Sequence, residues 1–320
     1  MIPKKYKTFK NLDEQISILE DKGLIIPDKK YAKDVLLREN YFFINGYRHL
    51  LMQSSTDKKK FIPGTRFEEL YSIFLFDRSF RNIIFKYLLV IENNLKSITS
   101  YQLSKKYGFK EYEYLKPKNF SQDSSKRRQI NDLISKMKRQ IRINGGQHSA
   151  TQHYVQNYGY IPLWILVKVL SFGIIGELYL VLKDEDKQNI ANAYGIDFKE
   201  LESYLPILAN YRNLCAHEDL LYNNRSQKLI NDNIYHQKLN IPKDEEGIYL
   251  YGKNDLFALV IIMKQLLNND DFKNMTLELN QVIATLAYNL NTIRVEKVLK
   301  IMGFPPNWKD IVDIRSEVDG

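Results

Sequence analysis

The stretch FEELYSIFLFDRSFRNIIFKYLLVIENNLKSITSYQLSKKYG, residues 67–108, decides the fold class of this chain. Apolar side chains recur every three or four residues along it, which is the spacing of one face of an α-helix. The pattern stops at Tyr107–Gly108. Because the run is much longer than an average helix, we expect a break near residues 77–79. Glu92 lies among apolar residues and is expected either to pair with an arginine or to face solvent.

Similar helical spacing appears on both sides of this stretch, so we predict an all-α fold. Residues 41–51 leave two alternatives, a continuing helix or a turn at Asn45–Gly46. Residues 237–251 are a candidate for one short β-hairpin, and residues 220–233 are expected to be partly helical. The other helical segments that we predict are residues 11–19, 28–37, 126–142, 162–170, 174–182, 184–194, 197–217, 255–267, 277–290 and 292–302.

The composition is that of an ordinary globular protein with a basic surplus. The 320 residues are 44% hydrophobic, and 47 Lys and Arg against 38 Asp and Glu give a net charge of +9. Such a surplus favours a polyanionic partner such as nucleic acid. The single cysteine excludes an internal disulfide and fits a reducing cytoplasm. We expect no secretory signal and no membrane partner, because the most apolar run, residues 161–175, is too short to span a bilayer.

The candidate functional stretch is YRNLCAH, residues 211–217, at the end of a predicted amphipathic helix. Asn213 and His217 are four residues apart and share a helix face. Arg212 lies about 140° away from His217, so a bend or a second subunit would have to bring them together. Arg212 also falls on an apolar stripe, where a permanent charge needs a partner or a function. The other members of that stripe are Leu201, Leu205, Leu208 and Cys215.

Several other chemistries lack their sequence patterns. The five histidines show no HExxH motif and no zinc-ligand spacing. The chain has no GxxxxGK(S/T) phosphate loop, no GxGxxG and no GxSxG nucleophile elbow. Cys215 and His217 are two residues apart on one helix, so their side chains point apart and a Cys–His nucleophile pair is disfavoured. We therefore predict no cofactor and no metal. The simplest alternative for Arg212 and His217 is a structural arginine and a helix-end histidine.

An arginine, an amide and a histidine on a basic protein suit metal-independent cleavage of RNA. The substrate brings its own nucleophile, the 2′-hydroxyl, and the products are a 2′,3′-cyclic phosphate and a 5′-hydroxyl. A histidine can move a proton at either oxygen, an arginine can stabilise the extra negative charge at phosphorus, and Asn213 can orient the histidine or the phosphate. One histidine leaves the acid–base pair incomplete, so we expect two chains to contribute one motif each across a twofold axis.

Residues 126–142 form the most basic helical segment, with one acid, Asp132, and an apolar stripe on the opposite face. Two interpretations stay open, a solvated charged face and a face that contacts phosphates. The candidate RNA-binding residues are Lys126, Arg127, Arg128, Lys138, Arg139 and Arg142.

Short sequence motifs follow one another over about residues 41–308. They are INGYR (44–48), PGTRF (63–67), LFDRSFR (75–81), IENNLK (91–96), PLW (162–164), SFG (171–173) and GFPPNW (303–308). Together with the block at residues 212–217, they resemble the Abi family of bacterial abortive-infection proteins, of the AbiD and AbiF kind. The block itself resembles the Arg-x4–6-His motif of the HEPN ribonuclease superfamily.

The resemblance implies a HEPN-like helical bundle with additional helices, a homodimer with a composite site, and RNA cleavage that halts a phage-infected cell. Arg212 and His217 would be catalytic, with Asn213 beside them, and a small RNA or antitoxin would restrain the toxin. We expect an N-terminal helical segment (1–60), a HEPN-like core (61–235) and C-terminal helices packed on it (236–320), or one continuous domain. The alternative function is a non-catalytic RNA-binding or antitoxin-binding module, with Arg212 as a phosphate contact.

Overall fold

The computed structural model describes residues 8–53 and 60–314. Within these ranges the regular elements are α-helices and short 3₁₀ helices, and no strand forms, so the all-α prediction is confirmed. The prediction of a β-hairpin at residues 237–251 is wrong. A single isolated antiparallel bridge, between Lys243 and Tyr249, forms there, and no strand. The start of that segment belongs instead to helix α12 (Ile234–Lys238), which Asn233 caps, and Pro242 has no N–H to offer a ladder.

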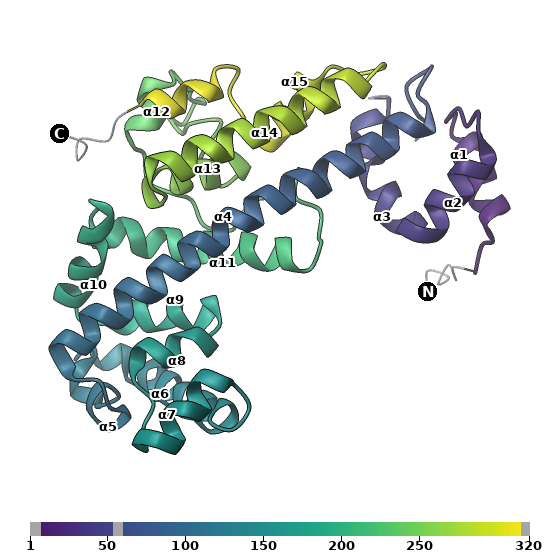
Figure 1. The fold of residues 1–320 in the computed structure, drawn as a ribbon. Helices are drawn as coiled ribbons and strands as arrows, with labels where there is room; N and C mark the ends of the chain where they lie inside the picture. The colour runs from purple at the N-terminus through teal and green to yellow at the C-terminus, as the bar shows by residue number, and fades with distance from the viewer. Residues whose placement is uncertain (1–7, 54–59, 315–320) are drawn as a thin grey trace, which may run out of the picture.

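Helix α4 (Phe67–Tyr107) is the axis of the molecule and continues without interruption from one end to the other (Figure 1). Its 41 residues span about 60 Å at 1.5 Å per residue. The break expected near residues 77–79 is absent. Asp77 and Arg81 lie one turn apart on α4, are buried and form an ion pair at 3.1 Å. Because each charge is paired with the other, the two residues are accommodated within α4 and do not end it. Gly108, with φ at +89°, ends α4 in a conformation that glycine adopts without strain.

A small helical unit packs at the N-terminal end of α4 (Figure 1). A helix continues through Asn45–Gly46 into a 3₁₀ turn, so the helical alternative for residues 41–51 is confirmed. The backbone of Ile25 pairs with Thr65 and Phe67 and ties this unit to the start of α4. Its helices are α1 (Leu12–Asp21), α2 (Lys29–Glu39), α3 (Tyr41–Gly46) and η1 (Tyr47–Leu51).

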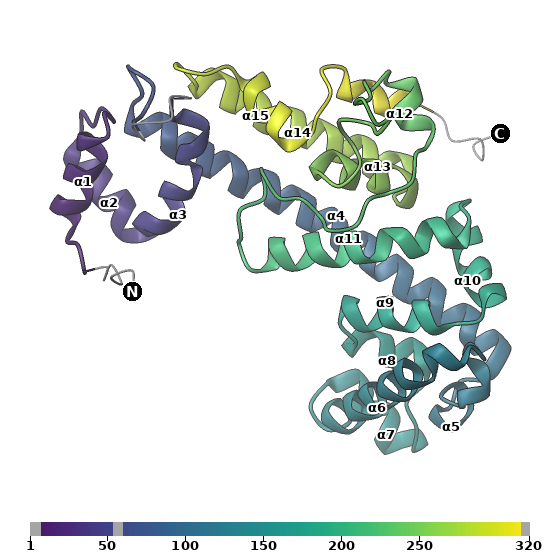
Figure 2. The ribbon, with the colours of Figure 1, turned by 180° about the vertical axis from the view of Figure 1, so that it is seen from behind.

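A second group of helices surrounds the C-terminal half of α4 (Figure 2). Residues 161–175, the most apolar run, form two helices rather than one, because Ser171 caps the second by accepting the backbone N–H of Ile174. The helices of the group are α5 (Glu111–Tyr114), η2 (Pro117–Asn119), η3 (Ser124–Lys126), α6 (Arg127–Asn144), α7 (Ser149–Tyr158), α8 (Leu163–Val169) and α9 (Phe172–Val181).

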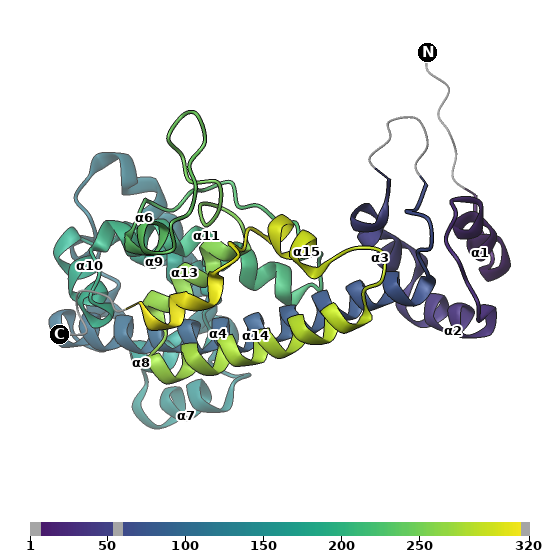
Figure 3. The ribbon, with the colours of Figure 1, turned by 90° about the horizontal axis from the view of Figure 1, so that it is seen from above.

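The last helices return along α4. Helix α14 lies beside α4 and runs in the opposite direction (Figure 3), since Glu278 contacts Lys86 while Thr292, just beyond α14, contacts Glu69 near the start of α4. Helix α13 is almost completely buried. This part comprises α10 (Asp184–Ala191), η4 (Asn192–Tyr194), α11 (Phe198–Ala216), α12, α13 (Leu256–Leu266), α14 (Asn269–Asn289), α15 (Val295–Met302) and η5 (Trp308–Asp313).

Residues 220–233, expected to be partly helical, form turns and irregular backbone instead. The backbone N–H groups of Leu221 and Tyr222 are bound by the side chain of Asp77 on α4, and this tertiary contact replaces the local hydrogen bonds that a helix would need. Among the described residues, no helix combines the length and the apolar character needed to cross a membrane.

Candidate functional site

Helix α11 delivers the Arg–Asn–x–x–Ala–His block to the middle of α4. Asp197 caps its start by accepting the N–H of Lys199, and Pro206 lies within it. The apolar stripe predicted from the sequence is buried against the core, as the exposed fractions of Leu201, Leu205, Leu208 and Cys215 show. Helix α11 packs on α4 and α9, so this stripe fixes the rotation of α11 and therefore the direction in which Arg212 leaves it.

Arg212 meets an acidic partner on α4. Its Nε donates to Oε2 of Glu92 at 3.2 Å, and Lys96, one turn further along α4, donates to the other carboxylate oxygen at 2.8 Å. Glu92 is therefore a partner of an arginine, one of the two alternatives that the sequence left open. The Arg212 side chain is 31% exposed. Neither of its terminal nitrogens makes a hydrogen bond within the described part of the chain, so both can receive an anion.

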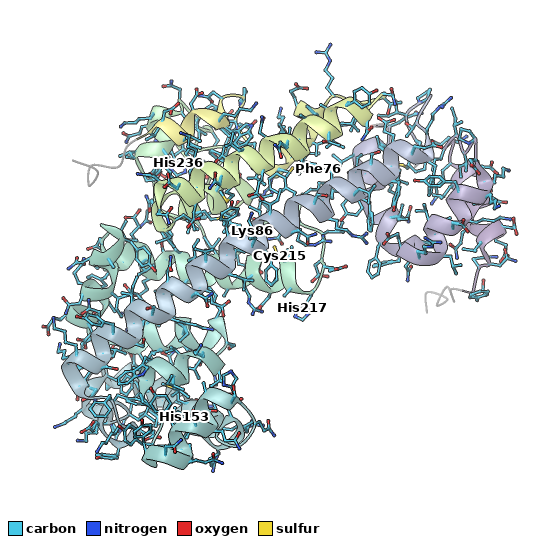
Figure 4. The ribbon with its side chains drawn as sticks, viewed as in Figure 1. Phe76, Lys86, His153, Cys215, His217 and His236 are labelled. Atoms are coloured by element: carbon cyan, nitrogen blue, oxygen red, sulfur yellow. The ribbon has the colours of Figure 1, made fainter. Side chains whose placement is uncertain are left out.

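His217 and Asn213 point away from this pair. His217 forms the C-cap of α11, where its backbone N–H donates to the carbonyl oxygen of Asn213, and both side chains are exposed. Figure 4 shows His217 at the free end of α11, on the open side between α1–α3 and α6–α9. In residues 8–53 and 60–314, the imidazole makes no hydrogen bond or ion pair. One chain thus brings Arg212 to Glu92 and leaves His217 available to a partner.

The segment directly after His217 is held by the buried pair on α4. The Asp77 carboxylate accepts the N–H groups of Leu221 at 3.1 Å and Tyr222 at 2.8 Å, and the hydroxyl of Tyr47 at 2.7 Å. Nη1 of Arg81 donates to the carbonyl of Asp219 at 3.1 Å. Burial raises the pKa of the Asp77 carboxyl, while these donors and Arg81 act in the opposite direction.

Sequence reasoning did not assign this holding role to Asp77 and Arg81. The available signal was a carboxylate and an arginine four residues apart inside an apolar run. Gly46 adds a second constraint, because a Cβ there would lie 3.2 Å from Leu220. The N-terminal unit therefore approaches the same segment closely. These contacts fix the backbone on the C-terminal side of His217, where Glu218 adopts a positive φ of 57°.

Cys215 is not a candidate nucleophile. It is the only cysteine of the chain, it is buried, and burial raises the pKa of its thiol to about 12. The thiolate is the reactive form, so the neutral thiol here acts as a small apolar side chain. The structure agrees with the sequence argument that disfavoured a Cys–His pair.

His236 is a buried histidine, and its surroundings are structural. Its ring stacks on Tyr249 at 4.7 Å between centroids, and its two nitrogens bind the carbonyl of Gly252 and the N–H of Asn233. Burial lowers its pKa, which favours the neutral form. No group of three or more His, Cys, Asp or Glu side chains able to hold a metal ion occurs among the described residues.

The six candidate RNA-binding residues divide into two sets. Lys126 donates to the carbonyl of Leu180, and Arg128 lies 4.0 Å from Asp132. The other four, Arg127, Lys138, Arg139 and Arg142, are exposed and have no ion-pair partner in the part of the chain that the structure describes. At 100° per residue, all four fall within about 120° around α6. The apolar stripe of α6 packs on α8 and α9, so the basic face is directed to solvent.

Comparisons with known proteins place this site within one family. A model of the family described as Abi-like protein matches residues 34–223, which include α4, α6 and the whole of α11. A search of curated proteins found no match, and a search of solved structures found none. Because the matched segment covers more than half of the 320 residues, the chain belongs to the Abi-like family of abortive-infection proteins.

Proposed function

We propose that this protein is a metal-independent endoribonuclease of the abortive-infection or toxin type, with Arg212, Asn213 and His217 as its catalytic group and a HEPN-type mechanism. The observation that carries the proposal is the state of Arg212. Its Nε is bound by a buried glutamate, and its guanidinium lies over the Phe85 ring. Its terminal nitrogens have no hydrogen-bond partner in the described chain, and its side chain is 31% exposed. A guanidinium fixed at one end and open at the other is suited to bind a phosphate.

The proposed reaction is a transesterification within the RNA. The 2′-oxygen attacks the neighbouring phosphorus, the bond from phosphorus to the 5′-oxygen breaks, the 2′-hydroxyl loses a proton and the leaving 5′-oxygen gains one. Arg212 would stabilise the added negative charge on the pentacoordinate phosphorus. His217 would transfer one of the two protons, since an imidazole can act as a general acid or a general base. Asn213, four residues before His217, would orient it or the phosphate.

The second proton requires a second acid or base, and we propose that a second copy of the chain supplies it. Arg212 is directed to α4 while His217 lies at the free end of α11, so the two do not converge within one chain. A twofold axis near the end of α11 would place both copies of the block in one site. Two of the other histidines do not serve this purpose: His236 is enclosed, and His153 belongs to α7 in the separate helical group of Figure 4.

The decisive test is cleavage by the purified chain in EDTA, followed by analysis of the new RNA ends. We expect 2′,3′-cyclic phosphate and 5′-hydroxyl ends, and a loss of at least ~100-fold in rate for Arg212→Ala and for His217→Ala. His153→Ala and Arg38→Ala are the matched controls, because both side chains are exposed and lie on other helices. Dependence on a metal ion, or full activity of His217→Ala, would contradict the proposal.

The two-chain site has its own test. An equimolar mixture of wild-type and His217→Ala chains, unfolded and refolded together, leaves about a quarter of the dimers with two wild-type chains. If each site needs both histidines, the activity per wild-type chain falls to about half. Unchanged activity per wild-type chain would show that each subunit works alone.

A second candidate function rests on the four cations of α6 that have no ion-pair partner in the described residues. In this alternative the protein binds RNA or an antitoxin without cutting RNA, and Arg212 is a phosphate contact. Salt-sensitive RNA binding with intact RNA ends after expression in cells would favour it. Sequencing of cellular RNA ends after induction of wild type or His217→Ala separates the two functions, since only an active nuclease adds ends that depend on His217.

A further inference from the structure

A cavity of about 450 Å³ lies between the C-terminal half of α4 and helix α8, outside the catalytic group proposed above. Its α4 side is a single helix face, because Ser97, Ser100 and Ser104 recur at spacings of three and four residues. Phe109, just after the end of α4, and Trp164 on α8 form the opposite side. The volume falls within the usual range for a site that takes a small molecule or one component of a larger one.

The walls of this cavity carry large aromatic rings that solvent can reach. Tyr101 is 64% exposed, Trp164 43% and Phe109 38%. Phe109 packs on Trp164, with 5.9 Å between the ring centroids, and on Tyr160 outside the cavity, at 5.6 Å. Rings of this size normally bury most of their surface. Three of them around one cavity provide flat faces on which another flat ring can stack.

The base of the cavity is polar. The Ser100 hydroxyl donates to the carbonyl of Ser97 at 2.9 Å and keeps its acceptor sites, whereas the Ser104 hydroxyl oxygen is buried and has no hydrogen-bond partner. Leaving a buried hydroxyl without a partner is unfavourable, and a change of the Ser104 rotamer toward the cavity would bring this hydroxyl to a ligand. Lys105 is exposed beside the cavity, and no ion pair within the described ranges holds it.

We propose that this cavity binds one unstacked base of a single-stranded RNA, with the adjoining phosphate next to Lys105. A nucleobase has flat faces for Tyr101 and Trp164, hydrogen-bonding edges for the serine hydroxyls, and a neighbouring negative charge. Single-stranded RNA is recognised through such a combination of stacking, edge contacts and cations. A base-paired duplex keeps its bases stacked on each other and does not fit. The assignment to RNA rests on the nuclease function proposed above.

The position of the cavity relates it to the catalytic group. Glu92, which binds Arg212, and Ser100, which lines the cavity, are eight residues apart on one straight helix, or about 12 Å along its axis. The base would therefore be held a short distance along the strand from the phosphate that is cut. This arrangement makes the cavity a determinant of where the RNA is cleaved, because contacts to the base edge select among bases while Arg212 does not.

Tryptophan fluorescence tests the proposal directly. The chain has two tryptophans, and Trp308 is only 3% exposed, so quenching by an added oligonucleotide reports on Trp164. The ligand is a 12-nucleotide 2′-O-methyl RNA, which has no nucleophilic hydroxyl, so that binding is measured apart from cleavage. We expect this RNA to quench the fluorescence of the wild-type protein. Affinities of the variants are measured by the anisotropy of the same RNA carrying a fluorescent label, with a loss of roughly 10-fold for Trp164→Ala and near wild-type affinity for Trp164→Phe. Thermal melting confirms that each variant is folded.

Two further variants and a control complete the test. Tyr101→Ala, at an exposed position of α4, should weaken binding by a similar factor. Lys105→Gln should lower the dependence of affinity on salt by about 0.7 in the slope of log K against log salt concentration, as expected when one phosphate of a single strand is no longer neutralised. Tyr288→Ala is the control, because that ring is exposed on α14 and outside the cavity. It should leave the affinity unchanged.

The outcomes separate this proposal from the nuclease function. Binding without quenching, or equal affinities for Trp164→Ala and Tyr288→Ala, would overturn the base pocket and leave cleavage by His217 untouched. Quenching of the wild-type protein, together with an affinity loss in Trp164→Ala that Trp164→Phe does not show when binding is measured by the anisotropy of a labelled RNA, supports the pocket, even if ordinary RNA is not cut. A mononucleotide that binds as tightly as the 12-nucleotide RNA would assign the cavity to a free nucleotide and overturn the RNA assignment.

Discussion

Two of the arginine–carboxylate pairs on helix α4 use the same chemistry in opposite ways. Asp77 pairs with Arg81 on the same helix, and both side chains are almost completely enclosed, at 0% and 3% exposure. Glu92 pairs with Arg212 from α11; the carboxylate is enclosed at 7%, but the arginine is 31% exposed. Asp77 binds the backbone after His217, whereas Arg212 keeps its outer end available.

The two pairs differ in the solvent exposure of the arginine. In the first pair both side chains bond to protein groups, including the backbone of Asp219 and Tyr222. Nε of Arg81 is buried without a hydrogen-bond partner among the described residues, so neither charge is open to a ligand from solvent. In the second pair a buried glutamate fixes an arginine that still has free donors. An arginine that is paired with a carboxylate is therefore not by itself a candidate for a catalytic role. The accessible end of the guanidinium is what distinguishes Arg212 from Arg81.

The largest expected effect is on stability, in the enclosed pair. Asp77→Ala leaves the Arg81 charge and two backbone N–H groups buried without their acceptor, so we expect the free energy of unfolding to fall by roughly 3–5 kcal/mol. Urea denaturation followed by circular dichroism measures this change. Asp77→Asn, which keeps an acceptor but loses the charge, should fall between the wild type and Asp77→Ala. An Asp77→Ala protein as stable as the wild type would remove the distinction between the two pairs.

Asp77 also shows why the sequence predicted the fold class but not the course of α4. The three- to four-residue spacing of apolar side chains is local, and it correctly indicated helices for α4, α6 and α11. The break expected at residues 77–79 was wrong because the side chains of Asp77 and Arg81 bond to the backbone of Leu221, Tyr222 and Asp219, more than 130 positions away. No local pattern reveals such partners. The same long-range contacts explain why residues 220–233 are not helical.

The candidate site, like the fold, was predicted only in part from the sequence. The apolar stripe of α11 indicated that Arg212 would face the core, and Glu92 was one of two alternatives on α4. Their pairing over a sequence separation of 120 residues came from the packing of α11 on α4. The cavity beside Trp164 was not anticipated, because it combines one face of α4 with residues from two later segments. The serines have helical spacing on α4, but nothing in the sequence relates them to Phe109 and Trp164.

The second largest effect is expected in the rate of cleavage and concerns the pair of Glu92 and Arg212. Glu92→Gln removes the charge that fixes Arg212, so the guanidinium can take other orientations, and we expect kcat to fall about 10- to 100-fold with a much smaller change in KM. The matched control is Glu278→Gln, which breaks the contacts of another glutamate with Lys86 and Tyr87 on α4. Equal losses in the two variants would indicate a general effect on α4 instead of a positioning role for Glu92.

The smallest effect is expected in the salt dependence of RNA binding by α6, where one cation is paired and others are not. Lys136 forms an ion pair with Glu177 at 2.7 Å, while Lys138 and Arg142 on the same helix are exposed and have no such partner in the described residues. We expect Lys138→Gln with Arg142→Gln to lower the slope of log K against log salt by about 1.4 for single-stranded RNA, or about 0.7 for each phosphate that is no longer neutralised. Lys136→Gln should leave the slope unchanged, because its charge is already neutralised by Glu177. Binding to an uncleavable RNA at several salt concentrations measures the slope. If all three substitutions had the same small effect, α6 would be a solvated charged face, and the phosphate contacts would have to be sought nearer to Arg212.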